Sequence, residues 1–289
     1  MKRKKLEDYI PLDKYWVIRM GVLDMVYGYK DINIFLENRK NLSGDLLALK
    51  SATHSWNTRL PVDIGESGTL YRFLQFASLK LNLNKKFVKR GTLNNRKVCN
   101  DPKIVNWNLE KLLKLDGGTS QWASASILLG NKEKIKNEPY FIKVTREAQK
   151  HWKERRKNRK VWSPKYDEVL LRQAKYFLDI FGSKKSKFKP RNPDDYCFAR
   201  VFNIIDKKYG EKNWPMLHGH ESDRLLEMEK IIALAKSGKT INSKDHRVIQ
   251  AIAMWGKVNK KEVKISHPEA VNKSWPQFWN FMENYKSFN

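Results

Sequence analysis

The chain has 289 residues, of which 40% are hydrophobic, so it can bury a sizeable core in one large domain or two smaller ones. No apolar stretch approaches the length of a membrane span, and no continuous apolar segment follows the basic start MKRKK, so we expect a cytoplasmic protein. Two cysteines, Cys99 and Cys197, are too few for a disulfide framework and lack metal-ligand spacing, which predicts free thiols and no bound metal.

The net charge of +27 is the strongest feature of the composition. It is typical of nucleic-acid binding, of a site for polyanionic small molecules, or of a coding bias that fills the surface with lysine. Residues 145–160 (TREAQKHWKERRKNRK) hold eight Lys or Arg in sixteen positions, and residues 183–191 (SKKSKFKPR) hold five in nine. The basic segment 145–191 is therefore a candidate interaction surface, with an amphipathic helix or a solvated loop as the alternative.

Apolar periodicity behind polar or glycine-containing entries predicts a series of helices along the chain. In chain order they cover residues 13–28, 65–81, 117–130, 162–182, 220–238 and 245–256. Two segments, KFVKRGTL at 86–93 and KKEVKISH at 260–267, alternate or cluster apolar residues as strands do. This mixture predicts an α/β or α+β fold.

Most of these helices carry an arginine near their start: Arg19, Arg72, Arg224 and Arg247. A fifth helix begins with Thr119, Ser120 and Gln121. A helix N-terminus has unpaired N–H groups and a partial positive charge, so an added arginine makes it better suited to phosphate or carboxylate. For any single helix a solvated or salt-bridged arginine is the commoner outcome. Five such entries in one chain point to anion binding.

Nine short motifs follow one another along the chain. They are PLDKYWVIR (11–19), GESGTLYRFL (65–74), RGTLNNRKV (90–98), GGTSQW (117–122), NEPY (137–140), NPDDYCFA (192–199), HESDRL (220–225), DHR (245–247) and VNKSWPQFW (271–279). Taken in this order they resemble the enolpyruvyl transferase family over nearly the whole chain; HESDRL matches its K-E-T-D-R-L almost letter for letter. No cysteine precedes Arg96, so the resemblance favours the shikimate branch over the peptidoglycan branch.

The resemblance implies a two-lobed inverse α/β barrel built of β-α-β-α-β-β units. The chain is shorter than the family, with about one unit missing between Tyr140 and Asp194 and a second shortening between Arg96 and Gln121. We expect residues 14–150 to form the first lobe, which binds phosphoenolpyruvate and the acceptor. Residues 1–13 and 151–289 form the second lobe, which contains most of the basic segment.

The implied reaction moves the enolpyruvyl group of phosphoenolpyruvate onto a hydroxyl of shikimate 3-phosphate and releases phosphate, as in the biosynthesis of chorismate and aromatic amino acids. No cofactor is implied, and we expect a monomer. The residues that the resemblance assigns to phosphoenolpyruvate are Lys14, Gly68, Arg96, Gln121, Arg224, Arg247 and Lys273. Those assigned to the acceptor are Arg19, Thr119, Ser120, Gln121, Tyr140, Asp194 and His220, with Arg72, Asp245 and His246 in support.

Proton transfer requires one group to accept the hydroxyl proton and another to protonate the methylene carbon. We assign these roles to Asp194 and Glu221, with Lys14 as an alternative donor. Each carboxylate also has a purely structural interpretation. Asp194 could cap the helix that follows it, and Glu221 could complement a helix dipole.

The departures from the family lie on the acceptor side, where Tyr15 and Asn137 replace serines and His220 replaces lysine. A different phosphorylated alcohol is therefore an alternative acceptor. A second alternative is a catalytically impaired relative that binds nucleic acid or another anion through the basic segment, where HWKERRKNRKVW interleaves aromatic and cationic residues.

Overall fold

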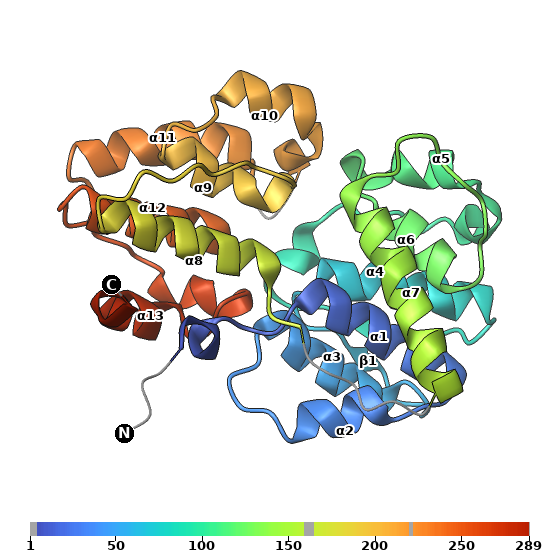
Figure 1. Ribbon diagram of the computed structural model, residues 1–289. Helices are drawn as coiled ribbons and strands as arrows, with labels where there is room; N and C mark the ends of the chain where they lie inside the picture. The colour runs from blue at the N-terminus through green and yellow to red at the C-terminus, as the bar shows by residue number, and fades with distance from the viewer. Residues whose placement is uncertain (1–4, 159–164, 220–221, 289) are drawn as a thin grey trace. The chain divides into compact units, whose positions relative to one another are not determined.

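The computed structural model describes residues 5–158, 165–219 and 222–288, which divide into two compact units (Figure 1). Unit 1 consists of residues 1–11 and 166–289, and unit 2 of residues 12–165. Each unit has its own hydrophobic core.

Unit 2 is mainly helical. Its α-helices are α1 (Lys14–Tyr27), α2 (Asp31–Glu37), α3 (Gly44–Ser55), α4 (Gly68–Lys80), α5 (Leu109–Leu113), α6 (Gln121–Leu128) and α7 (Tyr140–Asn158). Its 3-10 helices are η2 (Gly91–Asn95), η3 (Pro102–Asn106) and η4 (Leu115–Gly117), and its strands are β1 (Val62–Asp63) and β2 (Phe87–Val88). Helix α1 packs on α7, and α6 packs on both α4 and α7.

Helix α1 shows how the local sequence sets the bounds of an element. The Asp13 side chain caps it by accepting hydrogen bonds from the backbone N–H groups of Tyr15 and Trp16. Gly28 ends it in the left-handed conformation at φ 76°. The residues between are apolar on almost every side, and a helix of this kind is stable only when buried. Gly21 lets α3 approach, because a Cβ there would stand 2.8 Å from a methyl group of Leu49.

Unit 1 is built around one buried helix, α12. Its elements are η1 (Leu6–Tyr9), α8 (Glu168–Phe181), η5 (Pro193–Asp195), α9 (Tyr196–Val201), α10 (Lys207–Asn213), η6 (Pro215–Gly219), α11 (Arg224–Lys236), α12 (His246–Val258), η7 (Pro268–Lys273), α13 (Phe278–Asn284) and η8 (Tyr285–Phe288). Every residue of α12 from His246 to Gly256 is buried, and α8, α9, α11 and η7 pack on it. The N-terminal segment joins this unit through Trp275, whose indole N–H donates to the carbonyl of Tyr9 at 2.6 Å.

The helix predictions are confirmed, whereas the expected sheet is much smaller than an α/β fold requires. All six predicted helical segments contain a helix. Among the described residues the strands are β1 and β2, which pair in parallel at Val62–Phe87 and Asp63–Val88, and Ile241 forms an isolated parallel bridge with Ile265. The strand-like segment at 86–93 thus contributes two strand residues, and the one at 260–267 contributes the bridge. The chain is mostly helical with a small two-stranded sheet, and the predicted inverse barrel is not confirmed.

The sequence led us to expect neither a membrane span nor a metal site. No helix within 5–158, 165–219 or 222–288 combines the length and apolarity that crossing a membrane requires. The same residues bring no group of three or more His, Cys, Asp or Glu into a metal-binding arrangement. Both cysteines are free, as expected, and burial raises the pKa of the Cys197 thiol, which disfavours the reactive thiolate form.

Candidate active site

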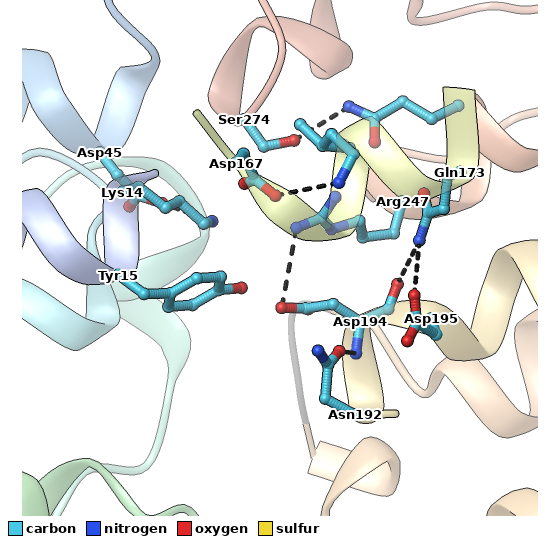
Figure 2. A network of polar contacts seen from close by, with 12 residues as sticks. Lys14, Tyr15, Asp45, Asp167, Gln173, Asn192, Asp194, Asp195, Arg247 and Ser274 are labelled. Carbon is cyan, nitrogen blue, oxygen red and sulfur yellow. Dashed lines mark hydrogen bonds and ion pairs between the residues drawn. The ribbon is translucent and has the colours of Figure 1, made fainter. Parts of the chain in front are cut away.

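The centre of the site in unit 1 is Asp194, towards which two arginines point. One oxygen of its carboxylate lies 3.4 Å from Nη1 of Arg224, and the other lies 3.7 Å from Nη2 of Arg247. Arg224 begins α11, and Arg247 is the second residue of α12. All three residues are buried, at 8%, 1% and 2% exposure. Figure 2 shows Arg247 directed at the Asp194 carboxylate. The two predicted helix entries of this unit therefore converge on one carboxylate.

Asp245 links the same two helices. Its carboxylate caps α12 by accepting the backbone N–H of Arg247 at 2.9 Å. It also accepts Nε of Arg224 at 2.7 Å and Nη2 of Arg224 at 3.1 Å, the two-point geometry that suits a guanidinium and a carboxylate. One aspartate therefore starts α12 and fixes the first side chain of α11.

The turn that carries Asp194 is held by residues that the sequence interpretation missed. Asp195 is fully buried and accepts hydrogen bonds from Arg172 at 2.8 Å, from Gln173 at 3.2 Å and from the backbone N–H of Arg191 at 2.8 Å. The side-chain oxygen of Asn192 accepts the backbone N–H of Asp194 at 3.0 Å (Figure 2). Two adjacent aspartates and a glutamine on the facing helix were the signal that could have indicated this support.

The helix-cap alternative for Asp194 is wrong. Helix α9 begins at Tyr196 with Asp195 as the residue before it, and Asp195 makes no side-chain cap hydrogen bond. Asp194 instead directs its carboxylate at the two guanidinium groups. The catalytic role of Asp194 stays a prediction.

The remaining predicted residues of unit 1 lie around α12. His246 is its first residue and is buried at 2% exposure. Lys273 ends η7, and the next residue, Ser274, accepts a hydrogen bond from Gln250 of α12 at 2.9 Å. The predictions for His220 and Glu221 fall outside the described residues.

In unit 2 a chain of hydrogen bonds runs between the first turns of α4 and α6. Nη1 of Arg72 donates to the amide oxygen of Gln121 at 2.9 Å, and the amide nitrogen of Gln121 donates to Thr69 at 2.9 Å. Nε of Arg72 donates to the carboxylate of Asp116 at 2.6 Å. Burial lowers the pKa of Arg72, an effect that Asp116 opposes and the nearby charge of Arg96 adds to.

Gly68 is the point at which two guanidinium groups approach the start of α4. A Cβ at this position would lie 3.0 Å from Nη1 of Arg72 and 3.1 Å from Nη1 of Arg96. Nη2 of Arg96 also donates to the hydroxyl of Thr92 at 2.8 Å, and that hydroxyl donates to Glu66 at 3.2 Å. The predicted residues Gly68, Arg72 and Arg96 are thus brought together with Thr69 and Gln121.

Lys14 has a carboxylate partner that was not foreseen. Its Nζ lies 2.7 Å from the carboxylate of Asp45 in α3, and both side chains are about nine-tenths buried, at 10% and 9% exposure. The Lys14 ammonium is also 5.3 Å from the ring centre of Tyr15, and that ring packs on Phe141. An acidic residue in the first turn of α3 was the only sequence signal for this pair.

Arg19 is enclosed by protein acceptors. Its guanidinium donates to the hydroxyl of Thr145 at 2.7 Å and to the carbonyl of Tyr15 at 2.8 Å. Longer hydrogen bonds reach Ser124 at 3.4 Å and the carbonyl of Phe141 at 3.3 Å. Its side chain is 1% exposed, and burial lowers its pKa to about 10. These contacts join α1, α6 and α7, and the predicted role in acceptor binding stays a prediction.

The other predicted acceptor residues lie at the starts of α6 and α7. Ser120 precedes α6 without making a side-chain cap, and the backbone N–H of Thr119 donates to Leu115 at 3.2 Å. Tyr140 is the first residue of α7, is 36% exposed, and packs its ring on Phe141.

The two units thus share one chemical arrangement, in which buried cations at helix starts are held by carboxylates or amides. Each such cation has several N–H donors, so it can donate to an anionic ligand as well as to its protein partner, and low dielectric surroundings strengthen that interaction. This arrangement suits substrates that carry phosphate or carboxylate groups.

Comparison with known proteins agrees with this chemistry. Residues 219–282, which contain Arg224, Asp245 and Arg247, match the family of EPSP synthase (3-phosphoshikimate 1-carboxyvinyltransferase). The resemblance to the enolpyruvyl transferases is therefore confirmed in this part of the chain. Over 111 residues the chain is 48% identical to the 3-phosphoshikimate 1-carboxyvinyltransferase of Aquifex aeolicus (strain VF5).

That match covers 38% of this chain and 23% of the Aquifex protein, so the chain spans about a quarter of the length of the curated relative it matches. No solved structure matches the chain.

Proposed function

We propose that this chain transfers the enolpyruvyl group of phosphoenolpyruvate to a hydroxyl of shikimate 3-phosphate, in the biosynthesis of chorismate and aromatic amino acids. The observation that carries the proposal is the convergence of Arg224 and Arg247 on Asp194, since both arginines lie in the segment that matches the EPSP synthase family. Two buried guanidinium groups beside one carboxylate provide both charge for an anion and a proton acceptor.

In the proposed reaction Asp194 accepts the proton of the acceptor hydroxyl as its oxygen forms a bond to C2 of phosphoenolpyruvate. Glu221, or Lys14 as the alternative, gives a proton to the methylene carbon, which becomes a methyl group. The tetrahedral intermediate then loses a proton from this methyl group while the C2–O bond to phosphate breaks. Phosphate leaves, and the enolpyruvyl double bond is restored on the acceptor oxygen.

In this proposal the arginines bind the negatively charged groups of the substrates. The residues of unit 1 proposed for phosphoenolpyruvate are Arg224, Arg247 and Lys273. The residues of unit 2 proposed for phosphoenolpyruvate are Arg96 and Gly68, the first residue of α4. Gln121 contributes its amide to both substrates, and Thr119, Ser120, Tyr140 and Arg19 are the proposed acceptor residues. We further propose that the two units correspond to the two lobes of the family's architecture.

A phosphate-release assay with phosphoenolpyruvate and shikimate 3-phosphate tests the proposal. Release should require both substrates, and Asp194→Asn should lower kcat by on the order of 100-fold. Asp206→Asn is the matched control, because Asp206 caps α10 in the same unit and asparagine is an equally good cap. Equal rates in parent and Asp194→Asn would remove Asp194 from the mechanism.

Calorimetry separates the two halves of the proposal. Binding of phosphoenolpyruvate without turnover of shikimate 3-phosphate would leave the two alternatives, a different phosphorylated alcohol as the acceptor or a catalytically impaired relative. If phosphoenolpyruvate itself does not bind, the proposed transfer is wrong.

The structure weakens the nucleic-acid alternative. Arg155 is paired with Asp31 at 2.7 Å, and Arg156 is paired with Asp24 at 2.7 Å. Arg156 also stacks over Tyr29 at 3.5 Å from the ring centre. These two arginines hold α7 to the start of α2 and to α1, so part of the positive charge of the basic segment is used within the fold.

A further inference from the structure

A single carboxylate, that of Asp116, gathers three donors in unit 2. One oxygen accepts Nε of Arg72 at 2.6 Å and the indole N–H of Trp122 at 2.8 Å. The other oxygen accepts the backbone N–H of Cys99 at 3.0 Å. The side chain is 7% exposed, so the carboxylate relies on these protein donors rather than on bulk water.

The backbone at Asp116 is in the left-handed region, with φ 50° and ψ 45°. Residues other than glycine rarely adopt this conformation, and strain of this kind persists where the surroundings impose it. Here Gly117 and Gly118 continue the turn at φ 78° and 88°, and α6 begins three residues later at Gln121. The turn therefore brings the Asp116 carboxylate into contact with Arg72. In the chain it lies shortly before α6, the helix that begins with Gln121.

The hydrogen bonds of Arg72 determine which way the Gln121 amide faces. Because Nη1 of Arg72 donates to the amide, the amide oxygen must face Arg72, and the nitrogen then faces Thr69. An amide nitrogen carries two hydrogens, of which the contact with Thr69 uses one. The second can serve a ligand only while Arg72 holds this orientation.

Arg72 needs a counter-charge to stay in this position. Its guanidinium and that of Arg96 both approach Gly68, so two like charges lie at the start of α4. Asp116 offsets the charge of Arg72 and fixes it through Nε, which leaves Nη1 for Gln121.

We propose that Asp116 is a positioning residue for substrate binding: it holds Arg72 so that the Gln121 amide presents an N–H donor to the anionic substrate. This role rests on the proposed function for its kinetic consequence, although the orientation of Gln121 is a property of the free protein.

Two substitutions of Asp116 test the role. Asp116→Asn keeps the size of the side chain and tolerates a left-handed backbone, but it removes the negative charge beside Arg72 and leaves one acceptor oxygen for donors that now use two. Asp116→Gly removes the carboxylate and adopts this backbone without strain, so it protects the test against a failure of Asp116→Asn to fold. In both we expect kcat/KM for phosphoenolpyruvate to fall by on the order of 10- to 100-fold.

Trp122→Phe is the matched control. It removes one donor to the same carboxylate and leaves the pair between Asp116 and Arg72 in place. It should lower the thermal stability without changing kcat/KM beyond about twofold. Equal kinetic losses in Trp122→Phe and Asp116→Asn would mean that Asp116 only supports the fold, and would overturn the proposal.

A measurement that needs no turnover distinguishes this proposal from the proposed function. The side-chain amide resonances of Gln121 in ¹⁵N-labelled protein, assigned with Gln121→Asn, should move in Asp116→Asn and Asp116→Gly and stay in place in Trp122→Phe. If the parent releases no phosphate but these resonances move, the positioning role stands and the proposed transfer fails. If they do not move in either Asp116 variant, the positioning role is wrong.

Discussion

Each unit buries an arginine near a helix start against a carboxylate. The two units differ in the backbone structure that carries this carboxylate. In unit 1 the carboxylate beside Nε of Arg224 belongs to Asp245, which is also the N-cap of α12. In unit 2 the carboxylate beside Nε of Arg72 belongs to Asp116, which stands in a left-handed turn. A buried guanidinium needs a counter-charge, and either a helix-capping aspartate or an aspartate in a left-handed turn can supply it.

The units differ in what the rest of each guanidinium contacts. Arg224 and Arg247 share the carboxylate of Asp194, whereas Arg72 contacts the neutral amide of Gln121. Arg19, also at a helix start, is surrounded by hydroxyl and carbonyl oxygens. Position near a helix start is therefore insufficient to make an arginine a binding residue; the groups that the packing brings to it decide.

The largest effect is expected for Asp245→Ala. This substitution leaves the buried guanidinium of Arg224 without its two-point partner and removes a helix cap, which should cost about 3–5 kcal/mol of unfolding free energy. Urea unfolding followed by tryptophan fluorescence measures the loss. Asp206→Ala removes a cap alone and should cost only about 1 kcal/mol. Equal costs would show that Asp245 acts only as a cap.

Arg247→Lys and Arg19→Lys should differ in their effect on phosphoenolpyruvate, because Arg19 is proposed for the acceptor and is held by protein groups. We expect Arg247→Lys to lower kcat/KM for phosphoenolpyruvate by on the order of 100-fold, because lysine cannot offer the planar donor set to the ligand. Arg19→Lys should instead lower the unfolding free energy by about 2 kcal/mol, because it loses hydrogen bonds to buried acceptors. Steady-state kinetics and urea unfolding on both variants check this. The contrast breaks down if Arg19→Lys has the larger kinetic effect.

Lowering the pH should reduce the stability of unit 2 through His151 of α7. Burial lowers the pKa of this imidazole below its usual 6.5, and the nearby Lys165 and Arg155 add to the effect. The folded state therefore binds its proton less readily than the unfolded chain. The contribution of His151 is fully present above pH 6.5 and is lost as the pH falls below this value. Amide hydrogen exchange in α1 and α7 between pH 7.5 and 5 should show the loss, and His151→Gln should reduce it.

The smallest effect is expected for the exposed pair of Arg90 with Asp63, whose closest atoms are 2.6 Å apart. The hydrogen bond from Arg90 lowers the pKa of Asp63, so the pair stabilises the fold above the ordinary carboxyl pKa and loses this effect in acid. The Arg90 side chain is 64% exposed, so solvent screens the pair, and Arg90→Gln should change the unfolding free energy at pH 7 less than any substitution above. A larger loss in urea unfolding would mean that surface pairs matter as much as the buried ones.

Local sequence patterns were sufficient to predict the helices but insufficient to predict the sheet. Capping residues such as Asp13, Asp223 and Asp245 stand where the periodic apolar segments begin, and each caps its helix. The strand-like segments are short and lack a strong period, so pairing depends on what the tertiary structure brings beside them. The expected α/β barrel followed from the family resemblance, whereas the described residues carry two strands of two residues each.

What the sequence determined by itself was the series of helix starts and the cationic residues that stand on them, because capping and apolar periodicity act within a few residues of the chain. Only the tertiary structure decided which carboxylate meets which cation. Asp45, Asp116 and Asp194 lie 31, 44 and 30 residues from the Lys14, Arg72 and Arg224 side chains they contact. No local pattern encodes such pairs, since they form when packing excludes water and a buried charge must find its partner within the folded chain.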